Sequence, residues 1–63
     1  MLTQPEMASA RDDLRQAVSL AVDVREVFFC AGYVQGARVL KNVIDLLSDG
    51  IAALDKAISG AKP

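Results

Sequence analysis

The chain has 63 residues, of which 52% are hydrophobic and 24% charged, and a formal net charge of −1. This balance is typical of a folded domain and excludes a disordered chain, while the near-neutral charge excludes a strong long-range attraction to nucleic acid or to an anionic membrane. Because the chain contains one cysteine and no histidine, neither an internal disulfide nor an ordinary zinc site can stabilise it.

The first predicted element is a helix over about residues 5–31. Thr3 can cap its first turn, Pro5 has the φ angle that suits a first turn, and Glu6 stands three residues after the cap, where it completes a capping box. Ser9 offers a second possible start. No proline or glycine follows within the range, so the sequence predicts an uninterrupted helix.

This first helix carries two separate apolar surfaces when each residue is rotated by about 100° from the last. The broader surface, which we expect to pack against a second helix, consists of Leu14, Ala17, Leu20, Ala21, Val24, Val27 and Phe28. The narrower surface is a strip of Val18, Val22 and Phe29, flanked by Arg11, Arg15 and Arg25. One helix neighbour covers only one of these surfaces, so we expect the strip to contact another chain.

A hairpin turn is predicted at residues 31–36. Gly32 and Gly36 stand close together there, and the hydrophobic register of the first helix does not continue past them. No Ser, Thr, Asp or Asn lies near residue 33 to cap a new helix, so two alternatives stay open. One is a single long, kinked helix, and the other is a turn at residues 48–50.

The second predicted helix covers about residues 36–60 and ends at Gly60, which we expect to form a left-handed cap. Its main feature is a ladder with alternating steps of four and three residues, the spacing of a helix that packs lengthwise on another helix. The ladder consists of Tyr33, Ala37, Leu40, Ile44, Leu47, Ile51, Leu54 and Ile58. A further apolar stripe beside it consists of Val39, Leu46, Ala53 and Ala57.

These patterns predict an all-α fold, a two-helix antiparallel hairpin that forms a single domain over residues 1–63. Two helices cannot cover the extra apolar strips, so we expect the hairpin to dimerise into a four-helix bundle. A chain of this size is also marginal as a monomer. The predicted interface residues are Val18, Val22, Phe29, Val39, Leu46, Leu40, Leu47 and Leu54.

No set of residues with catalytic spacing was found in the sequence. Asp12 and Asp13 are adjacent and point about 100° apart on a helix, so they cannot act on one atom. Cys30 has no histidine to activate it, and no phosphate-binding motif follows Gly32 and Gly36. We therefore expect neither an enzyme nor a cofactor or metal site.

The favoured interpretation is a small non-enzymatic protein–protein interaction module, an adaptor, chaperone-like protein or inhibitor that binds itself and another protein. The alternative is an oligomeric binder of RNA or of a small phosphorylated ligand through Arg11, Arg15 and Arg25. The first thirteen residues lack the basic and apolar segments of a secretion signal, and no membrane-spanning stretch is evident. We therefore expect a cytoplasmic protein.

In length and helical pattern the chain resembles two groups of small helical hairpins. One is the plasmid-encoded RNA-binding Rop proteins, which are dimeric four-helix bundles. The other is the small co-chaperones of type III secretion needle subunits, and small phage-encoded inhibitors have a similar build. No motif carries the resemblance, so it implies an architecture and assigns no residue a role.

Overall fold

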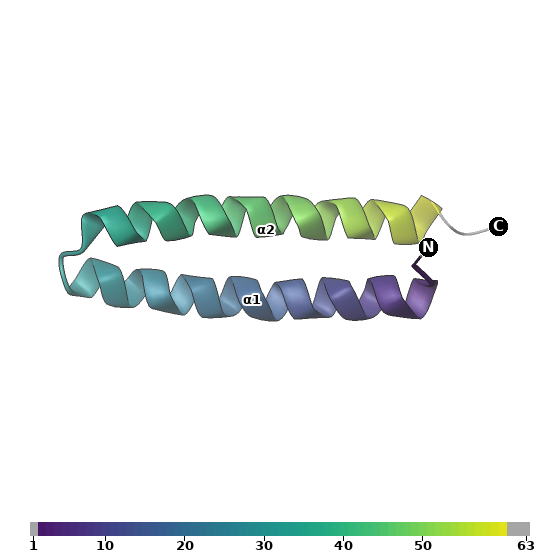
Figure 1. The fold of residues 1–63 in the computed structure, drawn as a ribbon, viewed down its shortest axis with the longest axis horizontal. Helices are drawn as coiled ribbons and strands as arrows, with labels where there is room; N and C mark the ends of the chain where they lie inside the picture. Colours follow the sequence, from purple (N-terminus) through teal and green to yellow (C-terminus); the bar gives the residue numbers. More distant parts are fainter. Residues whose placement is uncertain (1, 61–63) are drawn as a thin grey trace.

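The computed structural model describes residues 2–60, which form two helices, α1 (Gln4–Cys30) and α2 (Val34–Gly60). The helices run antiparallel along their whole length and form a rod with extents of 50 × 15 × 14 Å (Figure 1). The all-helical hairpin is confirmed. Because α2 continues without a break through residues 48–50, the alternative turn there is wrong. The single kinked helix is wrong as well, because the chain reverses between Cys30 and Val34 (Figure 1).

The start of α1 is the capping box that the sequence predicts. The Glu6 N–H donates to Thr3 Oγ1 at 3.3 Å, and the Thr3 N–H donates to Glu6 Oε1 at 3.0 Å. The backbone hydrogen bond from Thr3, followed by the bond from its hydroxyl, holds the pKa of Glu6 below its ordinary value of 4.5. Because Thr3 is the N-cap, helix α1 begins before Ser9, and Asp12 and Asp13 lie well inside the helix.

A Schellman motif at the end of α1 forms the turn. Its backbone hydrogen bonds allow α2 to begin directly after the turn, although no side chain caps α2. Gly32 has a φ angle of 78°, the left-handed conformation that favours glycine. The Tyr33 N–H donates to the Phe28 carbonyl at 2.8 Å and the Gly32 N–H to the Phe29 carbonyl at 3.1 Å, the two bonds that define this motif. The Tyr33 carbonyl then accepts from Ala37 at 3.2 Å and starts α2.

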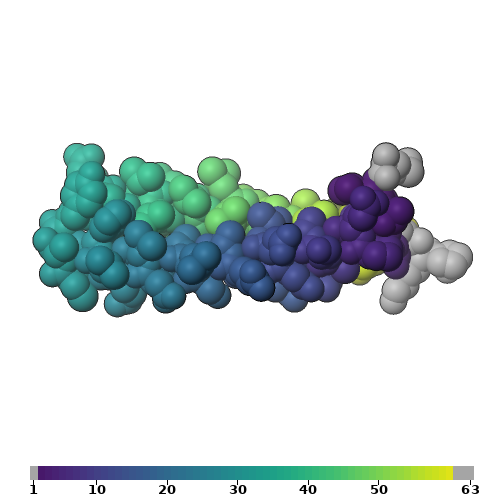
Figure 2. All heavy atoms as spheres, turned by 60° about the horizontal axis from the view of Figure 1, so that its bottom comes forward, coloured from purple at the N-terminus to yellow at the C-terminus, as the bar shows by residue number. Residues whose placement is uncertain are grey.

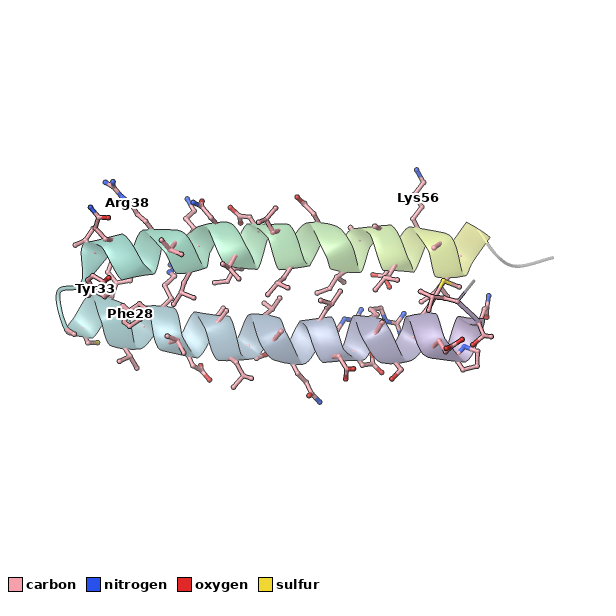
Figure 3. All side chains as sticks on the ribbon, viewed as in Figure 1. Phe28, Tyr33, Arg38 and Lys56 are labelled. Carbon is pink, nitrogen blue, oxygen red and sulfur yellow. The ribbon has the colours of Figure 1, made fainter. Side chains whose placement is uncertain are left out.

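Gly36 is buried inside α2 and is not part of the turn, so the predicted turn at 31–36 is too long. The Phe28 and Tyr33 rings meet edge to face with their centroids 5.1 Å apart (Figure 3). A Cβ atom on Gly36 would lie 2.6 Å from the Tyr33 ring and 2.7 Å from the Phe28 ring. Glycine is needed at position 36 for this close approach, and the turn itself is shorter.

The inner face of α2 is the predicted ladder. Its residues from Ala37 to Ile58 are all buried or half-buried, whereas Tyr33 packs on Phe28 and remains 55% exposed. Gly60 is the last helical residue, and Gly32 is the glycine with a positive φ angle in residues 2–60. The predicted left-handed cap at Gly60 is therefore wrong.

The inner face of α1 differs from the prediction by a rotation about the helix axis. The residues that the hairpin covers in steps of four and three are Met7, Arg11, Leu14, Val18, Ala21, Arg25 and Phe28. Leu20 and Val27, which were expected to face α2, are 66% and 63% exposed. Val18 lies in the seam, which is the line along which the two helices pack, and not on an outer strip. The physical reason is that Arg11 and Arg25 can cover the seam with their aliphatic stems.

The hairpin has a seam and no core. In residues 2–60 only Ala21, Gly36 and Ala37 are buried, and all three are small. Figure 2 shows the same narrow rod after a rotation of 60°. Each helix has a single neighbour, so large apolar side chains beside the seam stay in contact with water.

Replacing Gly36 by alanine is expected to destabilise the hairpin by about 1–3 kcal/mol, because the new methyl group overpacks the two rings. Gly50→Ala is the matched control in the same helix. Its Cβ would meet Leu14 at an ordinary 3.5 Å, so the higher helix propensity of alanine should stabilise the protein by about 0.5–1 kcal/mol. Urea unfolding followed by circular dichroism measures both, and equal effects of the two variants would contradict the close approach.

The capping box predicts a pH-dependent stability. The folded state lowers the pKa of Glu6, so this carboxylate stabilises the helix above pH 4.5 and the contribution is lost as the pH falls through the lowered pKa. Glu6→Gln keeps an uncharged capping box and removes the titration. The melting temperature of the native protein should exceed that of the variant near neutral pH, and the difference should shrink in acid. If the melting temperatures of the native protein and the variant changed with pH in parallel, the Glu6 carboxylate would contribute nothing to the pH dependence of stability.

Candidate interaction surfaces

The hairpin has two flanks, one on each side of the seam. Arg15 follows the seam residue Leu14, Asp55 follows Leu54, and the two side chains approach to 3.9 Å. In an antiparallel pair, the residues that directly follow Leu14 and Leu54 therefore lie on the same flank. The residues that directly precede the seam residues Val18 and Ile44 lie on the opposite flank. We call the first the polar flank. It consists of Arg15, Val22 and Phe29 of α1 and Val34, Lys41, Ser48 and Asp55 of α2.

The opposite, apolar flank carries six large aliphatic side chains, each at least one-third exposed. They are Leu20, Val24 and Val27 of α1 and Val39, Val43 and Leu46 of α2. Within each helix they follow the spacing i, i+4, i+7, which places them on one line. Because the chain reverses at Gly32, both lines lie at the same level along the rod and form one patch without a charged member. Contiguous exposed patches of this kind mark interaction sites.

Ion pairs occupy the polar flank at the open end of the hairpin. Asp55 accepts a hydrogen bond from Arg11 Nη1 at 3.1 Å and lies 3.9 Å from Arg15. Asp12 lies 3.7 Å from Arg11 and 4.0 Å from Arg15. Arg11 Nε is buried without a hydrogen-bond partner, so this network holds Arg11 in the seam at a cost. Two carboxylates thus neutralise two of the three arginines predicted to contact an anion.

The third arginine, Arg25, lies apart from this network at the turn end. Its guanidinium carbon is 5.6 Å from the centroid of the Phe29 ring, a cation–π distance. Arg25 and Phe29 line a concavity of about 160 Å³ together with Val34, Ala37, Arg38 and Lys41 of α2. The structure therefore does not bring Arg11, Arg15 and Arg25 together as one stripe, and it gives Arg25 two cationic neighbours from the other helix.

The predicted interface residues fall on three different surfaces. Val18, Leu40, Leu47 and Leu54 are half-buried in the seam, Val22 and Phe29 are exposed on the polar flank, and Val39 and Leu46 are exposed on the apolar flank. The sequence patterns did not predict that Leu20, Val24 and Val27 face outward, or that Arg38 and Lys41 line a concavity together with Arg25. The i, i+4, i+7 spacing of the three α1 residues that face outward was a visible signal, whereas the concavity depends on the pairing of the helices.

Other reactive groups in the described chain form no cluster. Cys30 is an exposed free thiol, and no three metal-ligating side chains gather in residues 2–60. Neither helix has an apolar stretch of the length and low charge that crossing a bilayer requires.

Comparison with protein-family models, with curated proteins and with solved structures found no match for this chain.

Replacing Asp55 by asparagine is expected to destabilise the hairpin by about 1 kcal/mol, because half-buried Arg11 loses its charged hydrogen-bond partner. Asp49→Asn is the control, since Asp49 is exposed on the same helix and makes none of the ion pairs found in residues 2–60. Its effect should stay within about 0.5 kcal/mol. Urea titrations at low and high salt measure both variants. An Asp55 effect no larger than that of Asp49 would contradict the network.

Proposed function

We propose that the protein is a small non-enzymatic interaction module that self-associates through its apolar flank and presents its polar flank to another protein. The single observation that carries the proposal is the apolar flank, six uncharged large side chains exposed on one side of a hairpin that has no core. Adaptors, chaperone-like proteins and inhibitors all fit this description.

A second copy is the occupant that fits the apolar flank best. A two-fold dimer uses the same surface twice, so each patch meets a patch of equal length and equal apolar character. The result is a four-helix bundle with two layers, in which the aliphatic side chains form the missing core.

The free energy available is large for a chain of this size. Full burial of a Val or Leu side chain is worth about 1.5–3 kcal/mol. The six members of the patch are 36–70% exposed, so covering them would contribute on the order of 5–10 kcal/mol per copy. That amount is comparable with the whole stability of an ordinary domain.

Binding of RNA or of a phosphorylated ligand through Arg11, Arg15 and Arg25 has less support. Asp12 and Asp55 pair with the first two arginines. A phosphate would have to displace these carboxylates, and the three guanidiniums do not form one surface.

Two matched pairs of substitutions test self-association. Val39→Gln with Leu46→Gln places amides in the apolar flank, whereas Val22→Gln with Phe29→Gln changes two apolar residues on the polar flank. Light scattering after size exclusion should give a dimer mass for the native protein and for the second pair, and a loss of the dimer for the first pair. Because dissociation can also unfold a marginal hairpin, helicity is measured in parallel by circular dichroism.

The dimer also predicts that the melting temperature of the native protein rises with protein concentration. A native protein that is monomeric and has a concentration-independent melting temperature would overturn the proposal. Loss of the dimer only in the Val22 and Phe29 pair would move the interface to the other flank.

A further inference from the structure

The concavity at the turn end of the polar flank combines an apolar floor with a basic rim. Phe29, Val34 and Ala37 contribute the apolar surface, and Arg25, Arg38 and Lys41 contribute the cations. Figure 3 shows Arg38 extending outward from α2 near the turn. The lining contains no carboxylate.

The three cations make none of the ion pairs found in residues 2–60. All four ion pairs in residues 2–60 use Arg11 or Arg15 at the other end of the rod. The first turn of α2 contains no acidic residue, so the positive end of the helix dipole adds to the same potential. Glu26 and Asp45 are the nearest acidic residues along the two helices, and both are exposed and unpaired with these cations. A chain with net charge −1 thus carries a local excess of positive charge.

The size of the concavity restricts what it can hold. Its volume of about 160 Å³ is close to that of a cavity that takes one benzene ring, roughly 150 Å³, and well below the roughly 300–1,000 Å³ of a pocket for a whole drug-sized ligand. One aromatic or aliphatic side chain fits. The Arg25 guanidinium lies over the Phe29 ring at a cation–π distance, so the basic rim and the apolar floor of the concavity are in direct contact.

We infer that this basic concavity binds an acidic segment of a partner protein, with one apolar side chain on Phe29 and Val34 and flanking Asp or Glu carboxylates on Arg25, Arg38 and Lys41. Charge complementarity at the rim and an apolar anchor in the centre are the two parts of a protein-interaction hot spot. A nucleic acid needs a basic groove that follows its backbone, whereas these cations surround a site of one side chain. The inference names the partner chemistry of the proposed interaction module and rests on that proposal.

The probe is a blocked pentapeptide with one phenylalanine between two pairs of glutamates, titrated into the full-length ¹⁵N-labelled protein. Saturable shifts of amide signals are expected around Phe29, Val34 and Lys41. The same peptide with glutamines in place of glutamates should bind at least tenfold more weakly, since each charge-assisted hydrogen bond is about twice as strong as a neutral one. Replacing phenylalanine by serine should weaken binding to a similar extent.

The double substitution Arg38→Glu with Lys41→Glu should lower the affinity for the acidic peptide at least tenfold. Lys56→Glu is the matched control, because Lys56 also points away from α1 but lies at the opposite end of α2 (Figure 3). Its affinity should stay within about twofold of the native value, since charges that far away are screened. Both variants are checked by circular dichroism and light scattering.

Three outcomes would overturn the inference. They are equal binding of the glutamate and glutamine peptides, no effect of the double substitution, and equally tight binding of inorganic phosphate with the same shifts, which would show a simple anion site. The proposed dimer can fail separately, because the concavity and the apolar flank lie on opposite sides of the hairpin. A monomeric protein that still binds the peptide would overturn only self-association.

Discussion

The packing of Phe28 and Tyr33 over Gly36 is the contact on which the rest of the structure depends. The Schellman motif reverses the chain within residues 31–33, and the two rings can close over α2 because position 36 has no side chain. This contact fixes the register of the two helices. At the far end of the rod the consequences are the Arg11–Asp55 ion pair and a 3.2 Å hydrogen bond from Gln4 to the Ile58 carbonyl.

A single layer of two helices has a physical limit that explains the exposed surface. Each helix can hide about one-third of its circumference against one neighbour, and both helices here have wider apolar arcs. The seam takes the heptad ladder of α2, and Leu20, Val27 and Leu46 are left at the side. The proposed dimer would relieve this exposure, and a second copy is a suitable cover because none of the six large side chains of the apolar flank is charged.

The charges divide the polar flank into two ends with different properties. At the open end Asp12 and Asp55 balance Arg11 and Arg15, and the ion pairs serve the hairpin itself. At the turn end Arg25 comes close to cations of α2 around an apolar concavity. The ion pairs at the open end hold Arg11 in the seam, whereas the cations at the turn end make none of the ion pairs found in residues 2–60.

The sequence by itself determined the local features of this protein. The capping box at Thr3, the ladder of α2 and the break at Gly32 depend on residues within a few positions of one another, and period and turn chemistry are enough to predict them. The fold class followed from these. The length of the turn could not be predicted in this way, because the rings of Phe28 and Tyr33, and not the backbone at position 36, require a glycine there.

Only the tertiary structure decided which side of α1 faces α2. The apolar arc of α1 is wide enough for several rotations, and the observed one places Arg11 in the seam because Asp55, 44 positions away in the chain, provides its partner. This rotation moved Val18 inward and Leu20 outward. It also decided that Arg25 of α1 and Lys41 of α2 line one concavity, an arrangement of two helices that no spacing within either helix encodes.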